Sequence, residues 1–181
     1  MPLLLPLPLP QSGPILDIMQ DTLSEAIDEN TPPPRLSELA YHPDEEIRAA
    51  VAGNSNTPLP TLAILFHDDS NDVRAIVARN SGLIRQFAAA NAIMQSTIPA
   101  DEKAIPGTIE RFSYQKQEMV RSSAARHPQL PIHLLVMLAY DPVDYVWEAA
   151  KVSPNAHLIP NAIWVEAALT RLNTAKEPPR E

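Results

Sequence analysis

The sequence has 181 residues, about the length of one domain, and its 45% apolar content is enough for a continuous core. Twenty prolines against four glycines argue against strand-rich folds and glycine-lined phosphate loops. The formal charge of −8 repels nucleic acid and anionic membranes. The absence of cysteine excludes disulfides, thiolate nucleophiles, cysteine-ligated zinc and iron–sulfur centres.

Residues 1–14 are expected to form an extended arm. Leucine and proline alternate in MPLLLPLPLP, which favours a polyproline-type chain, and no Lys or Arg precedes this run as in a secretion signal. No uninterrupted apolar run approaches the roughly 18 residues that a membrane helix needs. We therefore expect a cytoplasmic protein without membrane contact.

Residues 15–30 are predicted to form an amphipathic helix. Leu16, Met19 and Leu23 recur at helical spacing on one face, and acidic residues such as Asp17 and Asp21 lie on another. The segment NTPPP at 30–34 ends the pattern. The acidic face is either simply solvated or a docking surface for a basic partner.

The sequence then repeats itself with a period of 26 residues. IRAAVAGN at 47–54 recurs as VRAIVARN at 73–80, and two weaker copies follow, with Val120-Arg121 and Val146-Trp147 at the equivalent positions. Such a period indicates stacked helical units. Thr57 is expected to cap the helix that follows it, with Pro58 in its first turn.

One insertion interrupts the repeat. Arg74 and Arg121 are 47 residues apart, so about 21 residues are extra, and we place them at about 88–108. Residues Leu83 to Gln95 are predicted to form one long helix, followed by a proline-broken loop that contains Asp101 and Glu102. The insertion is either a binding element or a decayed repeat.

The pattern L-x-x-L-A-x-x-P-x-x-x-(I/V)-R-A-x-V-A-x-N-x-x-T-P, nearly complete in residues 36–58, resembles the leucine-rich repeat variant, a relative of HEAT-like repeats. The resemblance implies an all-α fold: a right-handed α-solenoid of four to five two-helix repeats over residues 31–173, with a polar tail at 174–181. The outer faces of the terminal units of such an array must be polar. Some members of that family carry an iron–sulfur module, which the lack of cysteine excludes here.

Two sets of arginines recur at equivalent positions, and we refer to them together as the arginine ladder. They are Arg48, Arg74 and Arg121, with Arg79 and Arg126 at a second equivalent position five residues further on. We expect them to pair with acidic corner residues such as Asp44, Asp68 or Asp72. The other interpretation is a track for nucleic acid, as in HEAT-like DNA glycosylases, which the nearby acidic residues oppose.

No catalytic constellation is evident. The five histidines form no H-x-x-x-H or H-E-x-x-H pair, and we expect corner or packing roles for them: His42, His67, His127, His133 and His157. No serine lies in a G-x-S-x-G elbow. We therefore expect no enzyme, no cofactor and no metal. The alternative is a HEAT-repeat lyase-like chaperone with a small ligand, which requires a pocket.

Tyrosine and tryptophan gather toward the C-terminal half, where they either anchor an interface or fill the core. Our hypothesis is a non-enzymatic interaction module, such as an adaptor, inhibitor or assembly factor. It would bind a partner protein, one with a basic surface, through the concave face, and no nucleic acid. The candidate partner-binding residues are Tyr114, Tyr140, Tyr145, Trp147, Arg79, Arg126, Asp101 and Glu102.

Overall fold

Capping side chains and prolines divide the chain into short helices. Asp44 accepts a hydrogen bond from the backbone N–H of Glu46 (2.9 Å), and Ser70 accepts from that of Asp72 (3.1 Å), so that a helix begins after each. The computed structural model describes residues 14–97 and 107–174, which contain helices and no strand. The prediction of an all-α fold is therefore confirmed for the described residues.

The helices are α1 (Pro14–Ile27), α2 (Pro33–Leu39), α3 (Glu45–Gly53), α4 (Leu59–Leu65), α5 (Asn71–Ala78), α6 (Ser81–Gln86), α7 (Ala88–Thr97), α8 (Thr108–Ser113), α9 (Glu118–Ala125), α10 (Ile132–Ala139), α11 (Asp144–Lys151), the 3-10 turn η1 (Ala156–Leu158) and α12 (Asn161–Thr174).

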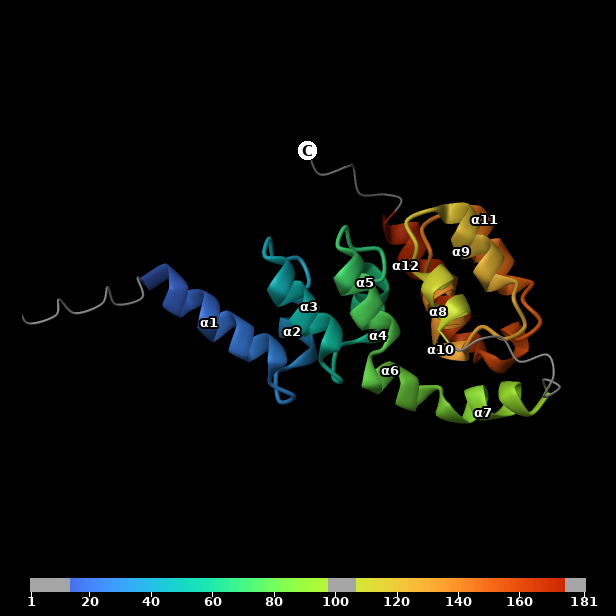
Figure 1. Ribbon diagram of the computed structural model, residues 1–181, viewed down its shortest axis with the longest axis horizontal. Helices are drawn as coiled ribbons and strands as arrows, with labels where there is room; N and C mark the ends of the chain where they lie inside the picture. The colour runs from blue at the N-terminus through green and yellow to red at the C-terminus, as the bar shows by residue number, and fades with distance from the viewer. Residues whose placement is uncertain (1–13, 98–106, 175–181) are drawn as a thin grey trace, which may run out of the picture.

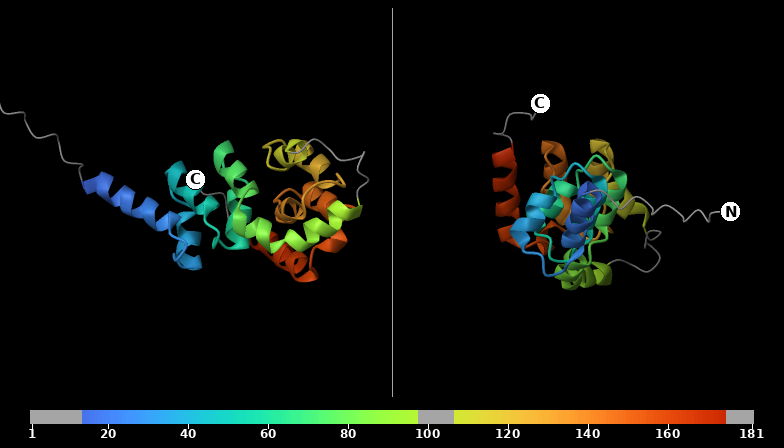
Figure 2. Two further views of the ribbon diagram at one scale, coloured as in Figure 1. Left: turned by 60° about the horizontal axis from the view of Figure 1, so that its bottom comes forward. Right: turned by 90° about the vertical axis from the view of Figure 1, so that its left-hand side faces the viewer.

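The helices form an elongated array in which α1 to α5 follow one another in chain order, while the last helix, α12, returns to lie beside α5 (Figures 1 and 2). Helix α1 lies at one end and packs on α3, which packs on α5; at the other end, α9 packs on α11. Helices α6 and α7 run along one edge of the array and lead from α4 and α5 to the second half of the chain (Figure 1). Most close pairs therefore join helices near one another in sequence. None of the described helices has the length and apolar character needed to cross a membrane.

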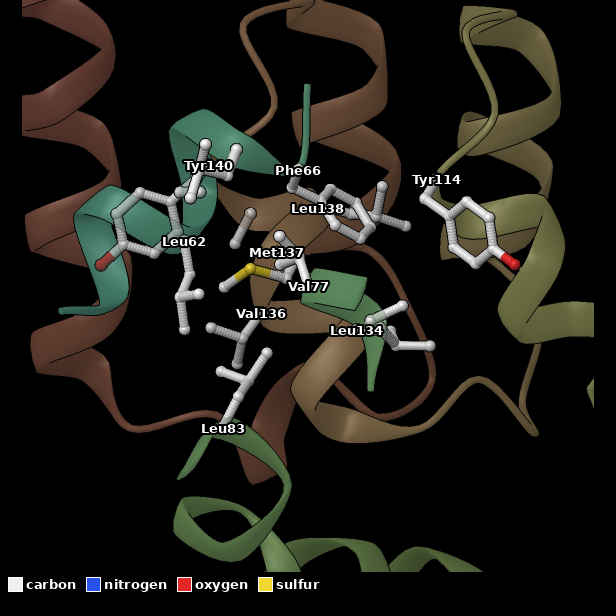
Figure 3. Close-up of a cluster of buried hydrophobic side chains, with 14 of the residues drawn as sticks. Leu62, Phe66, Val77, Leu83, Tyr114, Leu134, Val136, Met137, Leu138 and Tyr140 are labelled. Atoms are coloured by element: carbon white, nitrogen blue, oxygen red, sulfur yellow. The ribbon is translucent and has the colours of Figure 1, made fainter. Parts of the chain in front are cut away.

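Helix α10 is the centre of the core. All eight of its residues, IHLLVMLA, are buried, because α6, α7, α8, α9, α11 and α12 all pack against it. Figure 3 shows its side chains Leu138 and Met137 beside Phe66 and Val77 from the first half of the chain. The continuous cluster of buried side chains joins the two halves of the array.

Residues Leu83–Gln95 belong to two helices, α6 and α7, so the prediction of one long helix over this range is wrong. The break is at Phe87, whose backbone (φ −107°, ψ 14°) departs from helical values and whose side chain is buried. Met94, seven residues further on, is buried as well.

Two smaller expectations also fail. Thr57 donates its hydroxyl to the Val51 carbonyl (2.6 Å) and does not cap α4, whose N-cap is Pro58. The last helix is not polar on its outer side, because Val165, Leu169 and Leu172 of α12 are exposed. Residues 1–13 and 175–181, where we expected the arm and most of the polar tail, lie outside the described residues.

Candidate interaction surface

Two arginines of the ladder hold successive units of the array together in the same way. Arg48 donates to both carboxylate oxygens of Asp68, 20 residues later (2.7 and 3.1 Å), and to the carbonyls of His42 and Pro43. Arg121 donates to both oxygens of Asp141, also 20 residues later (2.6 and 3.1 Å), and to the carbonyls of residues 115 and 116. The pairing of Arg48 with Asp68 is the one that the sequence predicted.

Arg74 departs from this scheme in one respect. Its guanidinium bonds the carbonyls of Asp68 and Asp69 (2.6 and 3.0 Å), but its Nε donates to the Tyr114 carbonyl (2.9 Å), not to a carboxylate. The position equivalent to Asp68 and Asp141 in the third copy is Gln115, which has no charge to offer. Because the bond crosses the insertion, the units on both sides of it remain stacked.

Asparagine makes a second set of repeated contacts, which the sequence analysis missed. Asn54 donates to the carbonyls of Ala26 and Asp28 (3.0 and 2.9 Å), and Asn80 donates to those of Ala52 and Asn54 (2.8 and 2.9 Å). The sequence separations of 28 and 26 are the same in both cases. The signal was present, since the two asparagines are themselves 26 residues apart in the repeat.

The arginine ladder therefore offers few free cations. Arg74 and Arg121 are buried, and the Arg48 guanidinium is bonded to Asp68 and to the His42 carbonyl. Arg79 and Arg126 are exposed at the C-caps of α5 and α9, with no hydrogen bond to the described residues. A basic side chain at a helix C-terminus complements the helix dipole without any ligand.

The aromatic candidates divide into two buried and two accessible residues. Tyr114 packs edge-on against Phe66 (ring centroids 6.5 Å apart) and Tyr140 is also buried, at opposite sides of the cluster in Figure 3. Burial and the nearby Glu166 carboxylate raise the pKa of the Tyr140 hydroxyl. These two tyrosines fill the core and present almost no surface to a partner.

Tyr145 and Trp147 of α11 are the accessible aromatics. Tyr145 donates its hydroxyl to Glu118 (2.7 Å), which raises the pKa of that hydroxyl. Trp147 is half-buried, with the Lys151 ammonium 4.2 Å and the Arg171 guanidinium 5.0 Å from its ring centroid. It borders an open pocket of about 350 Å³ with Pro142, Asp144, Ala168, Arg171 and Leu172.

Helices α3, α5, α9 and α11 expose equivalent residues in two rows, which we call the first-turn row and the last-turn row. The first-turn row consists of Glu46, Asp72, Met119 and Tyr145, and the last-turn row of Gly53, Arg79, Arg126 and Val152. Met119 is 78% exposed and Tyr145 43%. Along the first-turn row the surface changes from acidic in the first half of the chain to apolar in the second.

The net charge of the chain follows the same division. Residues 1–80 contain twelve acidic and four basic residues, whereas residues 81–181 contain ten of each. The whole formal charge of −8 therefore belongs to the first 80 residues. Asp101 and Glu102, which we predicted to bind a partner, lie outside the described residues.

His67 and Asp141 are the nearest approach to an acid–histidine pair. The His67 Nε2 lies 3.9 Å from the Asp141 carboxylate and has no hydrogen-bond partner in the described structure. Burial, with help from Arg121 and Arg74, lowers the pKa of His67 to about 4 in spite of Asp141. Because Arg121 occupies both carboxylate oxygens, Asp141 does not orient the imidazole as a catalytic partner would.

The other histidines also lie in structural surroundings. His42 and His127 accept backbone N–H groups two residues ahead, from Asp44 (3.0 Å) and Gln129 (3.2 Å). His133 is buried in α10 against Asn91, and burial lowers its pKa to about 4. Within residues 14–97 and 107–174, no three His, Asp or Glu side chains are grouped as a metal site would require.

Comparison with known proteins adds no assignment. No family model matches the chain, and neither the curated proteins nor the solved structures contain a match to it. The array itself is thus the evidence for its class: an all-helical protein in which helices near in sequence pack on one another.

Proposed function

We propose that this chain is a non-enzymatic interaction module: a HEAT-like α-solenoid that binds another protein through the face formed by α3, α5, α9 and α11. The solenoid assignment is supported by the identical separations of the Arg48–Asp68 and Arg121–Asp141 pairs and of the two asparagine contacts. Repeats joined in this way present matching positions of successive helices on one surface.

The observation that carries the proposal is the composition of the first-turn row. Met119 and Tyr145 are large apolar side chains held in the open on neighbouring helices, next to Glu118. Glu46 and Asp72 extend the row with negative charge. A partner of matching chemistry has an apolar anchor for Met119 and Tyr145, and basic side chains along the acidic part of the row.

The test is capture of a partner from native lysate, with and without nuclease, by the immobilised full chain. We expect a stoichiometric protein that survives nuclease, and that is lost with a Met119→Glu/Tyr145→Ala variant. Ile93→Glu is the matched control, because Ile93 is an exposed apolar residue of α7, outside both rows. Retention of the same protein by the double variant, or recovery of nuclease-sensitive material only, contradicts the proposal.

A further inference from the structure

Helices α1 and α3 leave an open groove between them, at the end of the array that α1 forms (Figure 1). The groove has a volume of about 290 Å³. Its floor is apolar: Ile47 is buried, Leu23 is half-buried, and Met19 is 39% exposed. We call it the α1–α3 groove, and its lining consists of Met19, Gln20, Leu23, Asp44, Glu46 and Ile47.

The acidic residues at the rim of the groove already have a role in the fold. Asp44 caps α3 by accepting the backbone N–H of Glu46 (2.9 Å), and Glu46 lies in the first turn, where a carboxylate complements the helix dipole. Neither side chain therefore requires a cationic ligand. The part of the groove that the described residues leave open is its apolar floor, and a methionine there adapts readily to an apolar side chain.

An apolar segment of the same chain joins α1 close to this groove. Residues 1–13, MPLLLPLPLPQSG, contain five leucines and no Asp, Glu, Lys or Arg, and they continue directly into α1 at Pro14. Met19 lies five residues beyond Pro14, which is about 7.5 Å along a helix, a distance that about three extended residues span. Thirteen residues can reach about 43 Å, so the segment is long enough to turn back and cover the whole groove.

The sequence of the segment suits such a contact in three respects. Its leucines are separated from α1 by Gln11, Ser12 and Gly13, and glycine accepts either sign of φ, as a reversal of the chain requires. Alternating leucine and proline favours a polyproline-type chain, which loses little conformational freedom when it docks. A short tether also gives the leucines an effective concentration at the groove of the order of millimolar, which a free partner rarely reaches.

We propose that residues 1–10 turn back along α1 and place their leucine side chains in the α1–α3 groove, against Met19, Leu23 and Ile47. The end helix of an array has a neighbouring unit on one side only, and the segment supplies cover on the other. Glu46 belongs both to the groove and to the first-turn row, so the docked segment adjoins the acidic end of that row. The inference does not rest on the proposed function, because it concerns a contact within one chain.

The first experiment compares two cysteine pairs in the full chain, which has no cysteine of its own. Leu7→Cys/Gln20→Cys joins the segment to the groove, and Leu7→Cys/Asp21→Cys is the matched control, because Asp21 is the next residue of α1, exposed but outside the groove lining. With a short bifunctional thiol reagent we expect cross-linking within one chain, at least about fivefold faster for the pair with residue 20, since only docking raises the local concentration there.

The second experiment adds one substitution to the Leu7→Cys/Gln20→Cys chain. Met19→Glu places a carboxylate on the floor of the groove and should slow the cross-linking to the rate of the control pair, because burial of that charge under leucine is costly. Ile27→Glu makes the same change at an exposed apolar residue of α1 outside the groove lining, and should leave the rate unchanged. Equal rates for residues 20 and 21, a rate unaffected by Met19→Glu, or cross-links that join two copies overturn the proposal.

Discussion

At the scale of single residues, charged groups are used here to fix backbone carbonyls. Arg121 is buried, bonds a fully buried Asp141, and satisfies two carbonyls of the corner before α9. A buried carboxylate that loses its partner keeps its desolvation cost without the compensating attraction. Removal of Arg121 is therefore costly because it leaves the Asp141 carboxylate without its cation and two backbone carbonyls without this donor.

We predict that Arg121→Met lowers the free energy of unfolding by about 3–5 kcal/mol, the usual cost of removing one partner from a buried ion pair. Arg126→Ala, at the exposed C-cap of the same helix, should change it by less than about 0.5 kcal/mol. Chemical denaturation of both variants checks this. Equal stabilities of the two variants would show that the Arg121–Asp141 contact is dispensable.

Two buried histidines predict a pH dependence. The pKa values of His67 and His133 are lowered to about 4 by burial, whereas an unfolded histidine titrates near about 6.5. Between these values the unfolded chain binds protons that the folded chain does not, so stability falls as pH falls, by up to about 1.4 kcal/mol per pH unit for each histidine. Above about pH 6.5 both histidines are neutral in the folded and the unfolded chain, so the stability no longer depends on their titration.

The measurement is the free energy of unfolding between about pH 5 and 7, a window above the range in which the carboxylates titrate. His133→Gln should reduce the slope by the contribution of one histidine. A slope that is the same in the wild type and in His133→Gln would rule out a neutral, buried imidazole at this position.

At the scale of helices, one glycine fixes the approach of α6 to the preceding corner. A Cβ added to Gly82 would lie 2.2 Å from the Ser55 carbonyl oxygen, so the helix or the corner would have to move. A Cβ added to Gly53, within α3, meets the Ile76 side chain at 3.6 Å, an ordinary contact. A side chain is therefore expected to fit at position 53 but not at position 82.

We expect Gly82→Ala to destabilise the fold by about 1–3 kcal/mol through this overlap. Gly53→Ala should be neutral or stabilise it by up to about 1 kcal/mol, because alanine is the better helix former. Thermal unfolding of the two variants side by side provides the check. If Gly82→Ala is as stable as the wild type, α6 does not need this close approach to the corner.

The sequence predicted the helix pairs well, because their signals are local: capping residues, prolines and a 26-residue repeat. It did not predict which tyrosines are buried. Tyr41 and Tyr114 both follow the first helix of their unit, yet Tyr41 is exposed and Tyr114 lies under Phe66. That difference depends on which unit packs beside each tyrosine, and Phe66 is distant in sequence from Tyr114.

At the scale of the whole molecule, α10 and α1 differ strongly in burial and in the number of helices that pack against them. Helix α10 is buried on every side and packs against six other helices, whereas the main contact of α1 within the described residues is with α3, and α1 exposes Met19 and Ile27. The sequence contained the signal for the first, because a helix that is apolar all round is a buried one. In an array whose units contact mainly their neighbours, stability is expected to vary along the chain.

We predict that native-state hydrogen exchange will show this gradient. Amides of α10 should exchange only through global unfolding, and those of α1 through local opening at much lower free energy, because few contacts must break to release an end helix. Mass spectrometry at low denaturant concentrations can rank the segments. Phe66→Leu, which shortens a side chain in contact with Tyr114 at the junction of the two halves, should lower the protection of α10 more than that of α1. Equal protection of α1 and α10 would mean that the array unfolds as one cooperative unit in spite of its serial packing.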